Sequence, residues 1–258
     1  MQYTFYKYQG TGNDFIIIDN RTDNFFKNDT KLIEKLCDRK FGIGADGLIL
    51  LENDKHTDFR MVYFNADGKE SSMCGNGGRC IAAFAKKLGI VANEATFEAI
   101  DGKHHATINS NGTVSLQMKD VDAVSLHESY VFLDTGSPHH VEIVENLNSF
   151  DVKAEGAAIR YGDVYGTKGT NVNFVQQEAS DKFSVRTYER GVEDETLSCG
   201  TGVTAVAIAM KMLAKTDNDS IKLATPGGLL TVTFRQEGNT FSNIYLTGPA
   251  TFVFKGEI

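Results

Sequence analysis

Apolar residues along this chain fall into short runs rich in valine, isoleucine, phenylalanine and tyrosine, separated by glycine, asparagine and aspartate. Runs of this kind predict β-strands. In the first half we expect strands over residues 3–8, 15–18, 48–51, 59–64, 95–100, 104–108 and 114–118. In the second half we expect them over residues 130–134, 140–144, 172–176, 183–188, 221–223, 229–234, 241–246 and 251–254. The last of these has no counterpart in the first half, and we expect it to return to the first half's sheet.

Other segments have a helical rather than a strand-like pattern. Residues 29–37 read as an amphipathic helix whose first residue, Asp29, is an acceptable N-cap. A second helix is expected to begin at Cys74 and to stop at Gly89, and a third to begin at Cys199. The third is apolar on almost every side, which predicts a helix buried within its domain. Short strands around one buried helix imply a sheet that curls around it.

The two halves of the chain share landmarks in the same order. Thr11-Gly12-Asn13 corresponds to Thr135-Gly136-Ser137 and Phe41-Gly42 to Tyr165-Gly166 at a separation of 124 residues, and Cys74-Gly75 corresponds to Cys199-Gly200 at 125. Chance similarity in a glycine-rich chain is the weaker explanation of a constant order and spacing. The matches predict two copies of one fold.

We therefore expect an α+β protein with two pseudo-symmetric domains, each a curled, mostly antiparallel, barrel-like sheet around a central helix. The first domain would cover residues 1–120 together with the C-terminal strand at 250–258, and the second would cover residues 121–249. Two such domains side by side would leave a cleft that faces Cys74 and Cys199.

Composition and charge narrow the class of protein. The chain has 258 residues and a formal net charge of −8 at pH 7, which argues against nucleic acid or an anionic membrane as the main partner. Its apolar run at 15–18 is too short for a signal or a membrane span, so we expect a cytoplasmic protein. In that reducing setting a disulfide scaffold is not expected. The spacing Cys74-x5-Cys80 is a poor zinc pattern, so no metal is expected.

Two stretches place a cysteine directly before Gly-x-Gly at the expected start of a helix. They are Met73-Cys74-Gly75-Asn76-Gly77-Gly78-Arg79-Cys80 and Ser198-Cys199-Gly200-Thr201-Gly202. A helix N-terminus has unpaired backbone N–H groups and the positive end of the helix dipole. The N–H groups and the dipole favour a thiolate, and the N–H groups can also bind a carboxylate. Each stretch could therefore supply a reactive sulfur and an anion pocket.

Two thiols at equivalent positions suit inversion at a carbon atom. One thiolate can remove a proton from one face while the opposing thiol donates a proton to the other face. This scheme strictly needs neither a metal nor a cofactor, and the helix N–H groups would hold a substrate carboxylate and stabilise the developing charge. The structural alternative is that both cysteines are inert small residues at helix caps. It is the weaker interpretation because the cysteines recur at matched positions.

Several blocks of the chain resemble the signature of diaminopimelate epimerases. The blocks are Asn65-Ala66-Asp67-Gly68 followed by the Cys74 stretch, Gly10-Thr11-Gly12-Asn13-Asp14-Phe15, Tyr188-Glu189-Arg190-Gly191, and the Cys199 stretch, within a match from about Gly10 to Gly248. The resemblance implies inversion of one stereocentre of LL-2,6-diaminopimelate to the meso form, without pyridoxal phosphate, in lysine and peptidoglycan precursor biosynthesis. It also implies two similar α/β domains, each a sheet curled around a central helix, and often a homodimer.

Carried over by position, the resemblance makes Cys74 and Cys199 the acid/base pair. The residues that would bind the reacting carboxylate are Gly75, Asn76, Gly200 and Thr201, and those that would hold the distal amino acid end are Asn13, Asn65, Asn171, Glu189 and Arg190. His139 and Glu189 match residues thought to tune the thiols. An arginine suits the distal carboxylate because its planar fork binds bidentately.

Several of these residues also have a structural explanation. Asn13 and Asn65 sit in predicted turns, where asparagine is often purely structural. The Glu189–Arg190 pair could be a surface ion pair of little energetic value. His139 could be a satisfied structural histidine. Two further cysteines, Cys37 and Cys80, fall inside predicted helices and are expected to pack as small buried hydrophobes.

The chain departs from the family pattern near the expected site. Ser137 stands where many members have asparagine, and Gly47 where some have glutamine. We expect the distal contacts to be redistributed or filled by water there. Lys69 stands where the signature usually has serine, and it is expected on the surface of its turn.

Two other functions remain open at this point. One is a related cysteine-dependent proline or hydroxyproline racemase, whose substrate has one carboxylate and no distal ammonium group; Asn65, Asn171, Glu189 and Arg190 together favour the two-headed substrate. The other is a non-catalytic thiol redox or binding module on the same fold, in which Cys74 and Cys199 would form a disulfide if they lie close enough.

Overall fold

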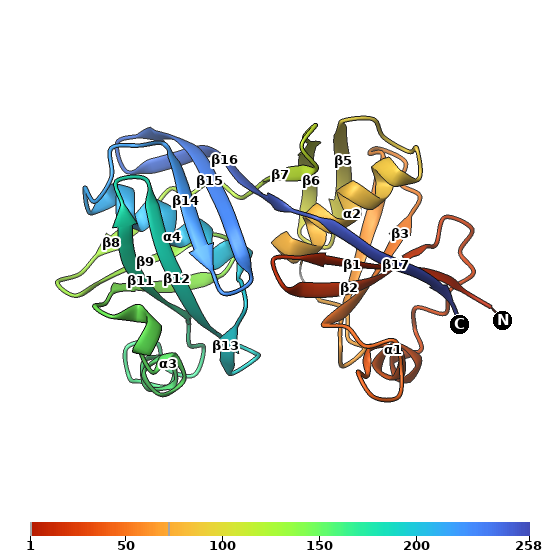
Figure 1. Cartoon of the computed structure of the whole chain (residues 1–258), viewed down its shortest axis with the longest axis horizontal. Helices are drawn as coiled ribbons and strands as arrows, with labels where there is room; N and C mark the ends of the chain where they lie inside the picture. Colours follow the sequence, from red (N-terminus) through yellow and green to blue (C-terminus); the bar gives the residue numbers. More distant parts are fainter. Residues whose placement is uncertain (1, 72) are drawn as a thin grey trace. The chain divides into compact units, whose positions relative to one another are not determined.

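The computed structural model describes residues 2–71 and 73–258. Its chain divides into two compact units (Figure 1), the first made of Met1–Leu116 with Gly248–Ile258 and the second of Gln117–Thr247. Because the C-terminal segment belongs to the first unit, the chain crosses between the units twice.

Unit 1 is a mixed sheet with two helices. Its elements in chain order are β1 (Thr4–Gly10), β2 (Asn13–Asp19), α1 (Thr30–Cys37), β3 (Gly47–Glu52), β4 (Phe59–Asn65), α2 (Gly75–Lys87), β5 (Glu94–Ala99), β6 (Gly102–Ile108), β7 (Thr113–Gln117) and the C-terminal β17 (Thr251–Glu257). The pairs β2–β3 and β4–β5 are parallel, and the pairs β17–β1, β1–β2, β3–β4, β5–β6 and β6–β7 are antiparallel.

Unit 2 repeats this pattern. Its elements are β8 (Val124–Leu126), β9 (Tyr130–Asp134), β10 (Pro138–Ile143), the 3-10 turn η1 (Leu147–Ser149), α3 (Val152–Arg160), β11 (Asn171–Ala179), β12 (Lys182–Glu189), β13 (Asp194–Thr196), α4 (Gly200–Met212), β14 (Ser220–Thr225), β15 (Gly228–Glu237) and β16 (Thr240–Pro249). The pairs β10–β11 and β12–β14 are parallel, and β8–β9, β9–β10, β11–β12, β14–β15 and β15–β16 are antiparallel. The predicted repeat is therefore a repeat of strand order and direction.

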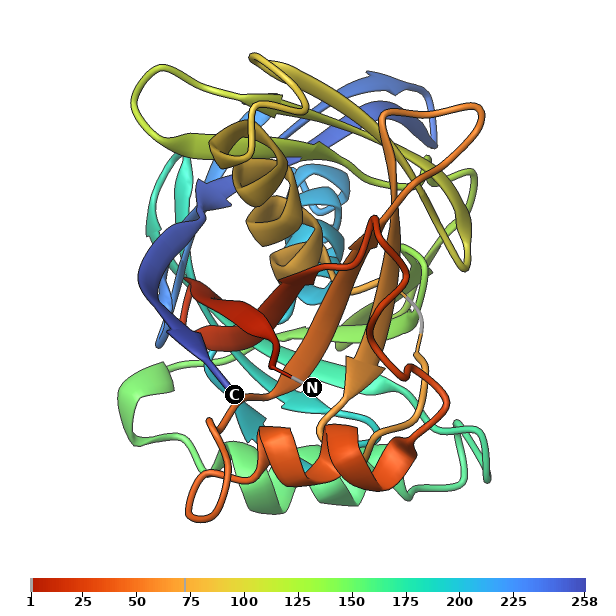
Figure 2. The same cartoon turned by 90° about the vertical axis from the view of Figure 1, so that its right-hand side faces the viewer.

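The central helix of each unit is buried. In α2 every residue from Gly75 to Ala82 is buried, and in α4 every residue from Gly202 to Met210 is buried. Figure 2 shows α2 inside the curve of the unit 1 strands. The expected α+β fold, a mostly antiparallel sheet curled around a central helix in each half, is confirmed.

A second helix in each unit covers the outer face of the sheet. The apolar face of α1, with Ile33, Leu36 and Cys37, packs against Ile16 and Leu48 on β2 and β3. These strands are buried on both faces, which explains their continuous apolar runs. The equivalent helix in unit 2, α3, packs on β11 and β12.

The sequence prediction missed α3. It begins at Asp151, whose side chain accepts a hydrogen bond from the Ala154 N–H, as Asp29 accepts one from the Leu32 N–H at the start of α1. The capping residue was visible in the sequence. The helix itself is short and rich in alanine and glycine, so its apolar face is weakly marked. The short strands β8 and β13 were missed for lack of length.

The sequence predicted that the C-terminal strand returns to the first half's sheet and that it has no counterpart in the first half. The first prediction is confirmed and the second is wrong. β17 pairs with β1, so residues 251–254 do return to the first unit. A counterpart nevertheless exists, because β8 pairs with β9 as β17 pairs with β1. β8 follows β7 of unit 1 and pairs with β9 at the start of unit 2. In the same way β17 follows β16 of unit 2 and pairs with β1 at the start of unit 1. Among the described residues, no helix is both long and apolar enough to cross a membrane.

Candidate functional site

Cys74 is the N-cap residue of α2. Its backbone is extended, with φ −96° and ψ 126°, and its side chain does not cap the helix N–H groups. The sulfur is half-buried and donates to Asn13 Oδ1 at 3.4 Å. The thiol therefore lies at the positive end of the helix dipole beside backbone N–H groups that point out of the first turn.

Cys199 occupies the same position on α4. Its backbone angles, φ −119° and ψ 116°, are again extended, and its side chain makes no cap hydrogen bond. The sulfur lies 3.4 Å from Thr201 Oγ1, and the residue is 8% exposed. The two cysteines are thus equivalent by fold as well as by sequence, each within its own unit.

A tight turn packs on the start of each cysteine-capped helix. In unit 1 the Thr11 hydroxyl donates to Asn76 Oδ1 at 3.3 Å, and in unit 2 the Thr135 hydroxyl donates to the Thr201 carbonyl at 2.9 Å. Gly12 and Gly136 in these turns have positive φ angles, 85° and 108°, which suit glycine. The repeated Thr-Gly dipeptides therefore hold the first turn of each helix.

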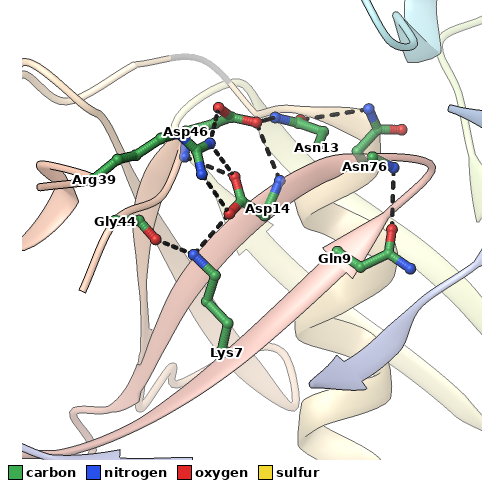
Figure 3. Close-up of polar contacts among 9 residues, drawn as sticks. Lys7, Gln9, Asn13, Asp14, Arg39, Gly44, Asp46 and Asn76 are labelled. Carbon is green, nitrogen blue, oxygen red and sulfur yellow. Dashed lines mark hydrogen bonds and ion pairs between the residues drawn. The ribbon is translucent and has the colours of Figure 1, made fainter. Parts of the chain in front are cut away.

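Asn13 is oriented by a cluster of charged residues (Figure 3). Its amide nitrogen donates to Asp46 Oδ2 at 2.6 Å, and its oxygen accepts from the Asn76 amide at 3.4 Å. The same oxygen faces Cys74 Sγ, also at 3.4 Å. Arg39 pairs with both Asp46 and Asp14, at 2.7 and 2.6 Å. The cluster fixes which end of the Asn13 amide the thiol meets.

Asp14 makes the stability of this cluster depend on pH. Burial alone would raise the pKa of Asp14, but hydrogen bonds from Arg39 and Lys7 outweigh burial and lower the pKa to about 2. A carboxyl group whose pKa is lower in the folded state stabilises the fold above its unfolded value of 3.8, and this contribution is lost as the pH falls toward 2.

We expect Asp14→Asn to reduce the free energy of unfolding by on the order of 2 kcal/mol at pH 7, because Lys7 is left buried without its carboxylate. The variant should also lose less stability than the wild type between pH 4 and 2. Denaturant unfolding at several pH values measures both effects. The exposed pair Arg235–Glu237 supplies the control, because Glu237→Gln should change neither. Parallel pH profiles for wild type and Asp14→Asn would contradict the prediction.

His139 on β10 is fully buried and neutral. Burial, followed by the nearby charge of Arg190, lowers the pKa of His139 to about 3. Asn173 Nδ2 donates to His139 Nδ1 at 3.1 Å and to the His140 carbonyl at 2.9 Å, and Asn173 Oδ1 accepts from Thr187 at 3.0 Å. This orientation assigns the ring proton to Nε2, which has no hydrogen-bond partner among the described residues.

Asn173 also lies against the start of α4. A Cβ atom on Gly202 would come within 2.5 Å of Asn173 Oδ1 and within 3.4 Å of Cys199 Sγ. Only glycine at position 202 permits this approach. The histidine, its asparagine partner and the helix that carries Cys199 are therefore connected.

Arg190 lies in the turn after β12 and is partly exposed. Its backbone N–H donates to Asn171 Oδ1 at 2.9 Å, and its guanidinium donates to the Lys168 carbonyl at 3.1 Å. The other end of the Asn171 amide donates to the Pro138 carbonyl at 3.0 Å. Glu189 ends β12, and its backbone carbonyl accepts from Val192 and Glu193 in the same turn. Asn171 thus fixes the turn that carries Glu189 and Arg190.

The remaining cysteines are buried and inert. Cys37 is 3% exposed and Cys80 is fully buried. Burial raises the pKa of each thiol to about 12. Their role is packing, as predicted.

The positions that depart from the family pattern have structural explanations. A Cβ atom on Gly47 would lie 2.5 Å from both the Phe64 carbonyl oxygen and the Tyr63 ring, so no side chain fits there. Ser137 accepts a backbone hydrogen bond from Thr135 and is half-buried. Lys69 is exposed and pairs with Asp67 at 2.9 Å, as expected on a turn surface.

The structure brings some of the predicted residues together within each unit. In unit 1 Asn13, Gly75 and Asn76 gather at Cys74, while Asn65 is exposed at the end of β4. In unit 2 Gly200 and Thr201 form the first turn at Cys199, Asn171 joins Arg190, and Glu189 adjoins them. The prediction did not include Asp46, Asn173 or Arg79. Asn173 could have been found as a polar residue inside the apolar run of β11, and Arg79 lies inside the Cys74 stretch quoted above.

Comparisons with known proteins agree on one family. A family model described as "Diaminopimelate epimerase" matches residues 5–124 and 131–253. A diaminopimelate epimerase of Flavobacterium psychrophilum is 65% identical over 253 residues, covering 98% of this chain and 99% of the relative. One of Chlorobaculum tepidum is 42% identical over 261 residues, with 96% and 98% covered.

Among solved structures, a phenazine biosynthesis protein of the PhzF family from Bacillus anthracis has a TM-score of 0.78 at 15% identity, covering 100% of this chain and 99% of that one. At this identity the likeness concerns the fold alone.

Proposed function

This chain belongs to the diaminopimelate epimerase family of isomerases, and we propose that it converts LL-2,6-diaminopimelate to the meso form by two-base, cofactor-independent chemistry. The observation that carries the proposal is the pair of cysteines at the N-caps of equivalent buried helices. Each half of the repeated fold therefore has a thiol at the start of its buried central helix, where the helix N–H groups favour both a thiolate and a bound carboxylate.

In the proposed reaction one thiolate takes the α-proton of the substrate and becomes a thiol. The other thiol gives its proton to the opposite face of the same carbon and becomes a thiolate, so that one C–H bond breaks, one forms, and the net charge of the pair is unchanged. The reverse reaction exchanges the two roles. Both groups must come within hydrogen-bond reach of the moving proton.

The reacting carboxylate would bind at the first turns of α2 and α4, through Gly75, Asn76, Gly200 and Thr201. N–H groups that are already oriented by a helix stabilise the negative charge that develops as the proton leaves, because they need no reorganisation. Asn13 would instead help to hold the distal amino acid end, because Asp46 takes its amide nitrogen and leaves an acceptor oxygen, which suits an ammonium group rather than a carboxylate.

The distal amino acid end would be held by Arg190, Glu189, Asn171 and Asn65 together with Asn13. Asn171 supports the proposal by fixing the Arg190 backbone in place. A neutral His139 cannot activate a thiol through positive charge, so we propose that its Nε2–H acts as a hydrogen-bond donor. Glu189 would then be the charged member of the pair that tunes the thiols.

We further propose that the two compact units are the two halves of one active enzyme, that it works in the cytoplasm, and that it serves lysine and peptidoglycan precursor synthesis. A homodimer stays a prediction.

Deuterium incorporation tests the proposed function directly. The protein in D₂O under reducing conditions should place solvent deuterium at Cα of LL-diaminopimelate and form the meso isomer, and it should leave L-proline and hydroxyproline unlabelled. Label in proline alone would favour a racemase. No exchange with any of these amino acids would support a non-catalytic thiol module.

We expect Arg190→Ala to weaken substrate binding, with an increase in KM of about tenfold or more and a smaller change in kcat. The reason is the loss of a bidentate charge-assisted contact with the distal carboxylate. Initial rates across substrate concentration separate the two parameters. Arg235→Ala, which removes an exposed arginine in the same unit, is the matched control. An unchanged KM for Arg190→Ala would remove Arg190 from the site.

A further inference from the structure

The turn at residues 189–193 connects β12 to β13 and carries the charged residues proposed for the distal end of the substrate. The N–H groups of Val192 and Glu193 close the turn by donating to the Glu189 carbonyl at 3.2 and 2.8 Å. The Glu193 side chain closes it a second time, because its Oε1 accepts from the Gly191 N–H at 3.1 Å. Glu193 therefore holds this turn with both its backbone and its carboxylate.

The carboxylate of Glu193 is also bound from outside the turn. Arg160, the last residue of α3, donates from Nη2 to Glu193 Oε1 at 3.3 Å, and the Tyr188 hydroxyl donates to Oε2 at 3.3 Å. Burial would raise the pKa of Glu193, but hydrogen bonds from Gly191 and Tyr161 and the charge of Arg160 outweigh burial and lower it. Glu193 is thus ionised near neutral pH, and it forms an ion pair with an arginine side chain that is only 12% exposed.

The same arginine packs on the loop that holds the Arg190 guanidinium. This loop contains Lys168, whose carbonyl accepts from Arg190 at 3.1 Å, followed by Gly169. Gly169 is buried and has a positive φ angle of 58°, and a Cβ atom on it would collide with the Arg160 guanidinium. Only glycine permits both the φ angle and the contact. Arg160 therefore contacts both of the segments that hold Arg190, the loop directly and the turn through Glu193.

Two features of this ion pair are unfavourable for the fold. Glu193 has a positive φ angle of 59°, which is uncommon for residues other than glycine. The corresponding residue of unit 1, at the separation of 125 that relates Cys199 to Cys74, is Gly68 with φ 78°. Arg160 Nε is buried and has no hydrogen-bond partner among the described residues, which also costs stability. Strained backbone of this kind is concentrated at functional sites, so the position of the turn explains the pair better than added stability does.

We propose that Arg160 and Glu193 are positioning residues that act through Arg190, and that their ion pair sets how strongly the enzyme binds the distal carboxylate of its substrate. The pair fixes the turn against the loop, both within unit 2, so that the planar fork of Arg190 is oriented before the substrate arrives. A side chain that is already oriented loses less conformational entropy on binding. This inference rests on the proposed function. It makes selectivity for a two-headed substrate depend on α3, a helix on the outer face of the sheet.

Amide hydrogen exchange tests the positioning without using the enzymatic reaction. In the full-length, reduced protein, exchange is followed by mass spectrometry of peptides that cover residues 166–170 and 189–193. Arg160→Met keeps an apolar stem and removes the charge, and it should raise the exchange rate of both segments by about threefold to tenfold, because they open more often. Arg160→Lys should restore most of the protection. Lys153→Met is the matched control, because Lys153 on the same helix forms an exposed ion pair with Asp194, the residue that follows the turn.

Steady-state kinetics then test the link to the substrate. Arg160→Met should raise KM for LL-diaminopimelate by about threefold to tenfold and leave kcat within about twofold, because the pair supports binding rather than proton transfer. In an Arg190→Ala background the same substitution should raise KM no further, since residues of one network are not additive. Glu193→Gln should raise KM by about twofold to threefold, because its amide oxygen still accepts from Arg160 but without the charge.

The outcomes separate this inference from the proposed function. Unchanged exchange in folded Arg160→Met overturns the proposal, and so does an equal rise of KM with and without Arg190. If Arg160→Met does not fold, Glu193→Gln takes its place in both measurements, because it removes the charge of the pair from the other side. A wild-type protein that places no deuterium in diaminopimelate refutes the proposed function and the substrate role of the pair with it, whereas hydrogen exchange still decides whether the pair holds the turn.

Discussion

Serine in place of either Cys74 or Cys199 is expected to reduce epimerisation by at least about a thousandfold while the fold is kept. General acid–base groups contribute roughly 10² to 10⁴ in rate, and a serine hydroxyl neither ionises near neutral pH nor reproduces the reach of sulfur. The substitution is nearly isosteric, and neither side chain caps its helix, so the loss should be chemical rather than structural. Conversion of LL-diaminopimelate to the meso form, measured by chiral separation, gives the rate.

The chain contains its own control for this experiment. Cys37 and Cys80 are buried thiols with pKa values raised to about 12, so they cannot take part in proton transfer near neutral pH. Cys37→Ala should lower stability by at most roughly 1–2 kcal/mol through lost packing and should keep wild-type kcat. Full turnover by either serine variant would end the two-thiol scheme. An equal loss in Cys37→Ala would show that the assay reports stability instead.

Most of the fold followed from the sequence because its signals are local and occur twice. The apolar runs of β2 and β3, the cap at Asp29 and the glycines after both site cysteines each point to one element. The strands that the sequence could not predict form only because a neighbouring strand pairs with them. The 3-residue strand β8 exists because β9 offers it an edge, and its length alone carries no pattern. The equivalence of β8 and β17 became visible only when the pairing was known.

The site was predicted less completely, for a similar reason. Cysteine before Gly-x-Gly at a helix start is a pattern with its own chemistry, so both thiols were found. Asp46 orients Asn13, and Asn173 orients His139. No sequence spacing predicts that a residue positions another side chain in this way. The neutrality of His139 depends on complete burial, which a single sequence does not reveal. Arg79 was visible in the motif, but its complete burial depends on the tertiary structure.

Gly202→Ala is expected to reduce kcat by about a hundredfold, in spite of its being favourable for helix formation. Alanine inside a helix stabilises it by about 1 kcal/mol relative to glycine. Here the new methyl group would meet Asn173 Oδ1 at 2.5 Å and Cys199 Sγ at 3.4 Å. Asn173 cannot withdraw without breaking its hydrogen bonds to His139 and Thr187. The start of α4 must therefore shift, and a displacement of about 1 Å at a reacting group lowers a rate by about 10².

The repeat supplies a matched variant, because Gly77 occupies the same position on α2. A methyl group there would meet the ends of flexible apolar side chains, Ile49 Cδ1 at 3.1 Å and Met61 Cε at 3.3 Å, which can move by a few tenths of an ångström. Gly77→Ala should therefore keep kcat within a few-fold. Steady-state kinetics and thermal unfolding of both variants make the comparison. Equal losses of kcat would mean that packing of the helix in its sheet, rather than the contact with Asn173, sets the position of the thiol.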